Sequence, residues 1–276
     1  MTDYDPDAFD AFEARSWAEK EAARYDGLAG RVTSRMADPL LDAVDAKPGR
    51  RVLDVATGPG YVAARAAERG AIVVGVDFSD TMLSFARARH PGVEFRNGNA
   101  LALPFADGSF DAVVAAFLLL HLGQPERAVA EANRVVAPGG RAAFTVWDGP
   151  ARSRWLGVLF DALADAGATP PADLPAGPPI FRFADDREFR GLLEGAGFSA
   201  VSVEVLEYSL HVDSADELWS GLVDGTVRFQ PLVRSQSDEV QSRIRARFGE
   251  LLEGYRVEDG FELPVSVKLA SGTRAS

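Results

Sequence analysis

The sequence predicts an α/β protein built on a doubly wound parallel sheet. Short apolar runs of strand length alternate with helical stretches between residues 51 and 147. The turn Thr57-Gly58-Pro59-Gly60 follows the first run and leads into a helix that begins at Tyr61. A repeated order of strand, helix and strand is typical of parallel sheets covered by helices on both faces. We therefore expect ligands at the edge where the strands end.

The composition favours a globular protein that acts on small molecules. The 276 residues are 47% hydrophobic and 25% charged, which suffices for a packed core. The net charge of -12 repels phosphate backbones and anionic lipid surfaces, so we expect no nucleic-acid or membrane partner. The absence of cysteine excludes disulfides and thiolate metal ligands. With only three scattered histidines, we predict no metal site.

The first 46 residues are predicted to form a helical cap. One helical stretch runs from Pro6 to Tyr25, and a second carries Leu28, Val32 and Met36 before a restart at Asp38-Pro39. The acidic start of the chain lacks the basic and apolar regions of a secretory signal, and no stretch reaches membrane-spanning length. These features predict a cytoplasmic protein, either a monomer or a homodimer.

Residues 47–276 are predicted to form the main domain, with a core at 47–150. Its strands are expected at 51–55, 71–77, 93–96, 110–117 and 141–147, and its helices at 61–69, 79–90 and 125–136. Helical lid insertions are expected at 151–197 and 213–256, with helices at 153–166, 186–196, 215–223 and 239–255. Later strands are expected at 201–210 and 264–270, and the pattern leaves the direction of the last one open.

Polar groups gather at the predicted carboxyl ends of the first three strands. Gly58 and Gly60 bring free backbone amides to a helix start, which suits an anionic group. Asp77 ends the second strand, where a carboxylate could accept hydrogen bonds from both hydroxyls of a ribose. Asn99-Ala100 follow the third strand and suit the edge of an adenine ring. The pattern indicates a nucleoside site.

Apolar groups complete this predicted site. Phe78 and Met82 lie where they could sandwich the adenine ring, and Ala116-Phe117 and Trp147 end the fourth and fifth strands. We expect a substrate pocket beside them, with aromatic walls supplied by Trp17, Tyr25, Trp147, Trp155, Phe181 and Phe229. Trp17 and Tyr25 are further predicted to close over a cationic ligand.

Five motifs follow one another along the chain: Val-Leu-Asp-Val-Ala-Thr-Gly-Pro-Gly at 52–60, Val-Asp-Phe-Ser at 76–79, Asn-Ala-Leu-Ala-Leu-Pro-Phe at 99–105, Phe-Asp-Ala-Val at 110–113 and Val-Val-Ala-Pro-Gly-Gly at 135–140. In this order they resemble the motifs of class I S-adenosylmethionine-dependent methyltransferases of the small-molecule, ubiquinone-methyltransferase-like branch. The resemblance implies a Rossmann-like sheet of seven strands whose last strand is antiparallel. It also implies S-adenosylmethionine as the cofactor.

The resemblance assigns cofactor contacts to residues of these motifs. The implied set is Asp54, Ala56, Thr57, Gly58, Gly60, Asp77, Phe78, Met82, Asn99, Ala100, Ala116 and Phe117. Asp54 either contacts the cofactor or ties the N–H groups of the turn together. Two positions depart from the family pattern, because Ala56 replaces a common glycine and Asn99 a common aspartate. Alanine fits the first position if its φ angle is negative.

The expected reaction is methyl transfer from S-adenosylmethionine to an oxygen, nitrogen or carbon of a small organic acceptor. Proximity and orientation in an aromatic pocket supply most of the rate enhancement, and His121 is the candidate base for an oxygen acceptor. Two alternatives stay open. A nicotinamide-dependent oxidoreductase also fits the glycine pattern at 58–63, and a non-catalytic protein could bind S-adenosylmethionine without transferring its methyl group.

Overall fold

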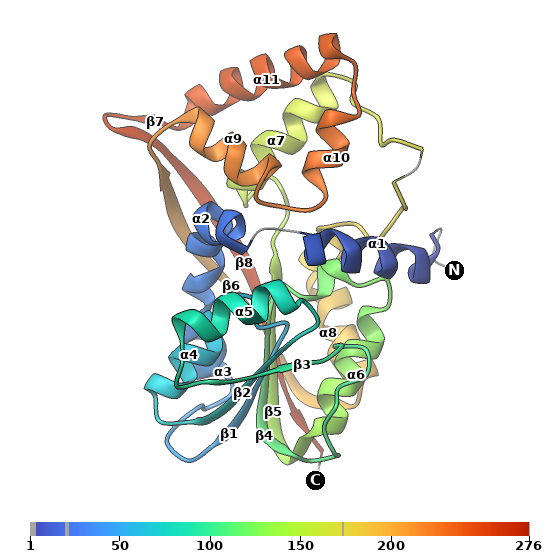
Figure 1. The fold of residues 1–276 in the computed structure, drawn as a ribbon, viewed down its shortest axis with the longest axis vertical. Helices are drawn as coiled ribbons and strands as arrows, with labels where there is room; N and C mark the ends of the chain where they lie inside the picture. Colours follow the sequence, from blue (N-terminus) through green and yellow to red (C-terminus); the bar gives the residue numbers. More distant parts are fainter. Residues whose placement is uncertain (1–3, 20–21, 173, 276) are drawn as a thin grey trace.

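One mixed sheet organises the protein (Figure 1). The computed structural model describes residues 4–19, 22–172 and 174–275. The strand order is β3-β2-β1-β4-β5-β8-β6. The bounds are β1 (Arg51–Val55), β2 (Ile72–Asp77), β3 (Glu94–Asn97), β4 (Phe110–Ala116), β5 (Val136–Trp147), β6 (Phe198–Val212) and β8 (Gly260–Arg274). A two-residue strand, β7 (Arg256–Val257), adds to the sheet by pairing with β8.

The direction of the strands confirms the predicted fold class. Strands β3, β2, β1, β4 and β5 pair in parallel, whereas β8 is antiparallel to both β5 and β6. The last strand of the chain is therefore antiparallel, as the resemblance implied. The short strand β7 is an addition that the sequence pattern does not reveal.

Helices cover both faces of the sheet and extend beyond it. The helices are α1 (Pro6–Glu19), α2 (Ala22–Thr33), α3 (Ala37–Ala43), α4 (Tyr61–Glu68), α5 (Asp80–Arg89), α6 (Pro125–Val135), α7 (Arg154–Asp165), α8 (Asp186–Gly195), α9 (Ala215–Val223), α10 (Phe229–Arg234) and α11 (Asp238–Leu252). The described residues also form short 3₁₀ turns, which are η1 (Ser34–Met36), η2 (Leu119–His121), η3 (Arg182–Ala184) and η4 (Glu253–Tyr255).

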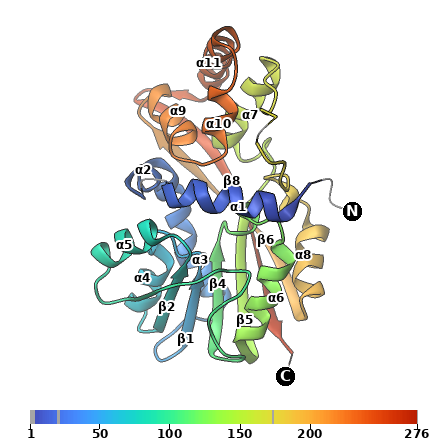
Figure 2. The ribbon, with the colours of Figure 1, turned by 45° about the vertical axis from the view of Figure 1, so that its right-hand side comes forward.

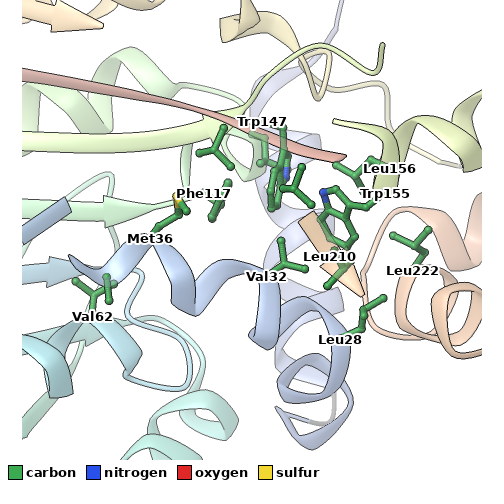
Figure 3. Close-up of a cluster of buried hydrophobic side chains, with 14 of the residues drawn as sticks. Leu28, Val32, Met36, Val62, Phe117, Trp147, Trp155, Leu156, Leu210 and Leu222 are labelled. Atoms are coloured by element: carbon green, nitrogen blue, oxygen red, sulfur yellow. The ribbon is translucent and has the colours of Figure 1, made fainter. Parts of the chain in front are cut away.

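Alternating strand residues build two cores on opposite faces of the sheet. In β1, Val52 packs into the larger cluster and the next residue, Leu53, packs into the smaller one, because successive side chains of a strand point to opposite faces. The larger cluster continues away from the sheet to the helices above it, and Trp147, Trp155, Leu28 and Leu222 all belong to it (Figure 3). One apolar core thus joins the sheet to the upper helices.

The long strands β6 and β8 carry a helical layer above the sheet. Figures 1 and 2 show α7, α9, α10 and α11 gathered at the far end of these strands, with α1 crossing between this layer and the sheet body. The crossing of α2 with α9 is close, since a Cβ built at Gly221 would lie 2.4 Å from the Cβ of Leu28. The amino-terminal helices therefore lie beside the edge where the parallel strands end.

Several element boundaries differ from the predictions. Strand β5 begins at Val136 rather than 141, so that Pro138-Gly139-Gly140 lie inside the strand beside a register shift of β4. The strands β6 and β8 are longer than expected at both ends, and helix α10 was not predicted. The helix expected from Pro6 to Tyr25 is replaced by α1 and α2, and residues 20 and 21 between them lie outside the described residues.

Candidate functional site

A cavity lies where β1, β2 and β4 end, and it brings most of the predicted cofactor residues together. We call it the first cavity. Twelve predicted site residues line it: Trp17, Tyr25, Ala56, Gly58, Asp77, Phe78, Met82, Asn99, Ala100, Ala116, Phe117 and His121. Glu13, Pro59, Ser79, Gly98, Leu118 and Leu122 also line it, and sequence reasoning assigned them no site role. The cavity occupies the strand-end position at which open α/β sheets bind ligands.

The glycine turn presents bare backbone to the first cavity. Gly58 has a φ angle of 50°, and a Cβ built there would meet no atom within 4 Å. Any larger residue at this position would project into open space that a ligand could otherwise fill. Ala56 lines the cavity with a φ angle of 55°, so the condition under which alanine fits this position, a negative φ angle, is not met. Holding alanine in this left-handed region costs about 1–2 kcal/mol, which glycine avoids.

A second strained residue lies at the end of the neighbouring strand. Phe117 follows β4 with a φ angle of 54°, and its ring stacks on Trp147 with 3.8 Å between ring centroids. Its backbone N–H donates to the side-chain oxygen of Thr145 at 3.2 Å. Positive φ angles in non-glycine residues gather at functional sites, and Ala56 and Phe117 both line the first cavity.

Asp54, Thr57 and Gly60 shape the turn from behind and are not among the residues that line the first cavity. The Asp54 carboxylate accepts hydrogen bonds from Thr57 Oγ1 at 2.6 Å and from the Ala63 amide at 3.0 Å. Complete burial raises the pKa of Asp54 to about 7, despite these two hydrogen bonds. Gly60 precedes α4, and a Cβ there would lie 2.8 Å from Phe95 Cζ. These three residues support the loop that faces the cavity.

Asp77 is held by backbone amides on both sides. Its two carboxylate oxygens accept hydrogen bonds from Gly58 N and Ser79 N, each at 2.9 Å. Burial raises its pKa, although these amide donors oppose the shift. Each carboxylate oxygen can accept a further hydrogen bond, so Asp77 is oriented to accept two hydroxyl donors from the cavity.

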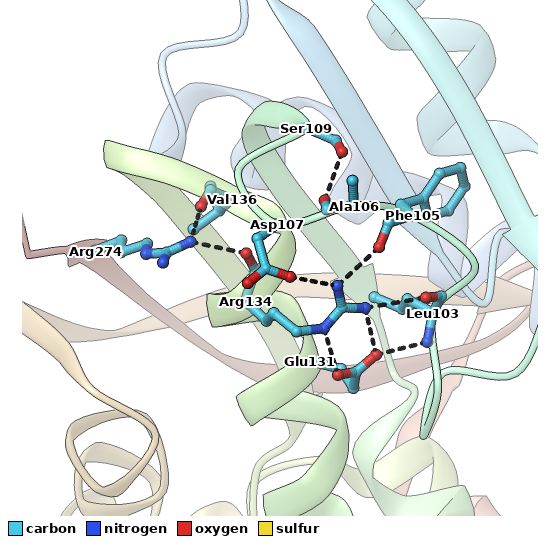
Figure 4. A network of polar contacts seen from close by, with 9 residues as sticks. All are labelled: Leu103, Phe105, Ala106, Asp107, Ser109, Glu131, Arg134, Val136 and Arg274. Atoms are coloured by element: carbon cyan, nitrogen blue, oxygen red, sulfur yellow. Dashed lines mark hydrogen bonds and ion pairs between the residues drawn. The ribbon is translucent and has the colours of Figure 1, made fainter.

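The stretch after β3 is fixed by a polar network that the motif alone does not reveal. Arg134 of α6 donates to the carbonyl oxygens of Leu103 and Phe105 at 3.0 and 2.7 Å (Figure 4). Its guanidinium also pairs with Glu131 and Asp107. Asn99 turns its side-chain oxygen to the Leu101 amide at 2.8 Å, which leaves its NH₂ group available to a ligand. The 99–105 motif is therefore partly a structural anchor.

A second cavity adjoins the first and has aromatic walls. Trp17, Tyr25, Phe117 and His121 line both cavities. The second is further lined by Trp147, Trp155 and Phe229, together with Ala29, Thr33, Leu120, Leu156, Ile180, Thr226, Val227 and Arg228. Phe181 is not among its lining residues, and its ring packs on Phe160 with 5.1 Å between centroids. Five of the six predicted pocket aromatics thus meet here.

His121 belongs to a buried polar cluster that sequence reasoning missed. Its Nδ1 lies 3.0 Å from the carboxylate of Glu13, which is 2% exposed and comes from α1. The same carboxylate accepts from Trp17 Nε1 at 3.0 Å and from Arg228 Nε at 2.7 Å. Burial alone would raise the pKa of Glu13, but the nearby His121 and Arg228 hold it below its usual value. Only the four-residue spacing of Glu13 and Trp17 on one helix hints at this contact in the sequence.

The other two histidines lie away from the two cavities. His90 ends α5 and His211 lies in β6, and neither lines the two cavities. Within the described ranges, no three histidine, aspartate or glutamate side chains gather in a way that could hold a metal ion. No helix in the described part of the chain has the length and apolarity needed to cross a membrane.

The fold and the cavity together define a nucleoside-binding α/β protein. A protein of Bacillus halodurans, described as a methyltransferase, shares this fold with a TM-score of 0.58, and the alignment covers 87% of this chain and 99% of that chain at 23% identity. A phosphoethanolamine N-methyltransferase of Haemonchus contortus, solved with S-adenosylhomocysteine, shares the fold at a TM-score of 0.52 and 18% identity, over 88% of this chain and 53% of that chain. These similarities show the fold.

Sequence relatives define the family. Residues 53–144 match a family described as a methyltransferase domain. A ubiquinone/menaquinone biosynthesis C-methyltransferase of Methylobacterium nodulans is 34% identical over 70% of this chain and 83% of its own length. A demethylmenaquinone methyltransferase of Renibacterium salmoninarum is 41% identical over 53% of this chain, and the match spans only 63% of that protein.

This chain belongs to the class I S-adenosylmethionine-dependent methyltransferases, in the branch of the ubiquinone and menaquinone methyltransferases. The cofactor of that family is S-adenosylmethionine, and the nicotinamide-dependent alternative is therefore set aside. The first cavity fits this cofactor, because the bare backbone at Gly58 and the oriented carboxylate of Asp77 suit its amino-acid and ribose parts.

Proposed function

We propose that this protein transfers a methyl group from S-adenosylmethionine to a small, flat, apolar acceptor that carries an aromatic hydroxyl group. One observation carries the proposal: the first and second cavities adjoin and share the walls formed by Trp17, Tyr25, Phe117 and His121. Two ligands bound in the two cavities would meet at these side chains. The Renibacterium relative is a demethylmenaquinone methyltransferase, and this name supports a hydroxylated aromatic acceptor of the quinol type.

In this proposal the first cavity binds the cofactor and the second binds the acceptor. Asp77, Phe78, Met82, Asn99 and Ala100 would hold the nucleoside, and the turn at Gly58 would receive the amino-acid part. When bound, S-adenosylmethionine supplies an electrophilic methyl group. The aromatic walls of the second cavity exclude water and orient the acceptor ring, and such orientation supplies roughly 7–11 kcal/mol of the barrier reduction.

His121 is proposed as the base for the acceptor hydroxyl. It lines both cavities, and among the described residues its Nε2 has no hydrogen-bond partner. Removing the hydroxyl proton makes the ring oxygen, and the ring carbons conjugated with it, better nucleophiles. The proposal therefore covers methyl transfer to either an oxygen or a carbon of the acceptor.

The test combines binding with product formation. We expect calorimetry to show binding of S-adenosylhomocysteine, and we expect Asp77→Asn to weaken it by about 10- to 100-fold, because hydrogen bonds to a charged group contribute about 1.5–3 kcal/mol. Asp216→Asn, on the exposed face of α9, is the matched control. With tritium in the transferred methyl group, label should enter 1,4-dihydroxynaphthalene and catechol but not alkyl amines.

Two results would contradict the proposal in different ways. No binding of S-adenosylhomocysteine would remove its basis entirely. Binding without labelled product across hydroxylated aromatics would instead favour the alternative of a non-catalytic cofactor-binding protein.

A further inference from the structure

Glu13 is buried, whereas a glutamate in a helix usually faces the solvent. It lies in the middle of α1, yet its side chain is 3% exposed and is surrounded by three hydrogen-bonding partners, two of which come from distant parts of the chain. One donor, Trp17, belongs to the same helix. The other two are His121, which ends η2, and Arg228, which precedes α10. Glu13 is thus the point at which α1, the sheet body and the upper helices meet.

The hydrogen bonds of Glu13 determine the state of His121. Arg228 donates Nε to one carboxylate oxygen at 2.7 Å and keeps the carboxylate ionised. An ionised carboxylate only accepts hydrogen bonds, so the proton on the neutral His121 ring must lie on Nδ1, which faces Glu13 at 3.0 Å. Nε2 then carries a lone pair. A histidine held in this tautomer can accept a proton from a ligand in the cavities.

We infer that Glu13 is a positioning residue that fixes the Nδ1–H tautomer and the ring orientation of His121, with Arg228 holding Glu13 in place. The inference rests on the proposed function for its effect on turnover. In the assisted step, the acceptor O–H bond breaks, its electron pair stays on the acceptor oxygen, and its proton moves to His121 Nε2. The resulting imidazolium faces the negative charge of Glu13, which stabilises it.

Arg228 is itself held by several contacts besides the one with Glu13. Its guanidinium donates to the backbone oxygens of Leu120 and Pro178 in addition to Glu13. It also stacks over the ring of Phe9 at 4.5 Å from the ring centroid. Arg228 therefore clamps α1 to η2, the segment that carries His121, and to the loop before η3.

Helix α1 packs closely against the neighbouring loops, and this packing holds Glu13 in place beside His121. A Cβ at Gly123 would lie 2.4 Å from the backbone oxygen of Pro6, and one at Gly177 would lie 2.2 Å from the ring of Phe9. Two residues without side chains thus let the first turns of α1, before Glu13, approach these two loops closely. Trp17 adds an edge contact with His121 at 5.3 Å between ring centroids, which restricts rotation of the imidazole.

The tautomer of His121 can be measured directly by NMR. Long-range ¹H–¹⁵N spectra of the ¹⁵N-labelled full chain at pH 8 resolve three histidines, and His121→Gln identifies the signals of His121. We expect the wild type to show His121 as the Nδ1–H tautomer. Glu13→Gln should abolish this preference. A glutamine places an NH₂ group, which cannot accept a hydrogen bond, where one of the two carboxylate oxygens lies, so its single oxygen cannot replace both acceptors that face His121 Nδ1–H and Arg228. Glu19→Gln, an exposed residue of the same helix, should leave the spectrum unchanged.

Turnover provides the second arm. Glu13→Gln should lower kcat for 1,4-dihydroxynaphthalene by about 10- to 100-fold, in line with the loss of other groups that orient a functional histidine. An unchanged tautomer in Glu13→Gln, or an unchanged kcat in a variant with an altered tautomer, would overturn the inference.

The NMR measurement of the His121 tautomer does not depend on the proposed function. A chain that fails to bind S-adenosylhomocysteine contradicts the proposed function but leaves the tautomer measurable. If Glu13→Gln does not fold, the wild-type spectrum still decides, because an Nε2–H tautomer there overturns the inference. Glu13→Asp, which keeps the charge on a shorter side chain, should retain more of the Nδ1–H signal and more of kcat than a folded Glu13→Gln variant.

Discussion

Two buried aspartates at the ends of adjacent strands have different neighbours and different tasks. Asp77 faces the first cavity and is oriented by two backbone amides. Asp54 faces away from it and ties Thr57 to the first turn of α4. Both are aspartates near the ends of adjacent parallel strands, but Asp54 pairs with Gly75, two residues before Asp77. The contacts of each carboxylate then separate a ligand-facing group from a loop-supporting one. Of the two open interpretations of Asp54, these contacts favour the structural one.

Asp54 gives a prediction for the pH dependence of stability. Its pKa is raised from 3.8 to about 7 by burial, so the folded state holds this proton more tightly than the unfolded state. The stability it contributes is complete below pH 4 and is lost as pH rises towards 7. Relative to Asp54→Asn, the wild type should therefore lose about 1.4 kcal/mol of unfolding free energy per pH unit in this window.

Urea denaturation of both proteins at pH 4.5, 5.5, 6.5 and 7.5 measures this difference. Asp107→Asn, which changes an exposed aspartate, is the control and should run parallel to the wild type. A constant difference between Asp54→Asn and the wild type across the series would show that Asp54 is ionised throughout.

At the scale of elements, α1 owes its position to small residues in the loops beneath it. Gly177 lies so close to Phe9 that even a methyl group would overlap its ring. Gly177→Ala should therefore displace Phe9, destabilise the docked helix by about 1–3 kcal/mol and speed amide exchange in α1 by about tenfold or more. Hydrogen exchange followed by mass spectrometry measures this effect.

A matched glycine substitution separates the local effect from a general one. Gly191→Ala lies in α8, where a Cβ would meet no atom within 4 Å, and it should leave exchange in α1 unchanged. Equal exchange of α1 in Gly177→Ala and the wild type would mean that Phe9 moves aside without loosening the helix.

The sequence pattern predicts elements best where the apolar signal is strong. The predicted bounds of β1 and α9 agree with the structure, because each combines a clear apolar pattern with flanking turn or capping residues. The prediction was wrong at Pro138-Gly139-Gly140. These residues are typical of a turn before a strand, but β5 runs through them. The prediction also missed α10, a six-residue helix with an internal proline, since so short a segment has little periodicity.

The site was predictable at the strand ends and unpredictable elsewhere. Asp77 ends one predicted strand and Asn99 follows another, so their place at one sheet edge comes from topology alone. Glu13 lies in a charged helix, where a glutamate normally faces solvent. Its burial depends on Arg228, 215 positions later in the chain, and no local pattern reports such a pairing.

At the scale of the whole molecule, the sheet body and the upper helices contribute to different cavities. Phe78, next to β2, lines only the first cavity, whereas Phe229 of α10 lines only the second. Phe78→Ala should weaken binding of S-adenosylhomocysteine by about 5- to 10-fold, the loss of about 1–1.4 kcal/mol of ring contact. Phe229→Leu should keep that affinity within about twofold and raise KM for the aromatic acceptor about tenfold.

Calorimetry and initial rates on both variants test this division, with each variant serving as control for the other. Equal effects of both substitutions on cofactor affinity would show that the two cavities act as one site. Phe78 is 40% exposed, so its replacement should cost little stability, and differences in cofactor affinity can be assigned to lost contact.

The carboxylates around the first cavity also bear on how the protein tells its charged cofactor from the spent form. Arg228 neutralises Glu13, whereas Asp77 faces the cavity without a basic partner among the described residues, within a chain of net charge -12. Such a field favours the sulfonium cation over the thioether that remains after the methyl group has left. We therefore expect this electrostatic attraction to be weaker for the by-product than for the cofactor.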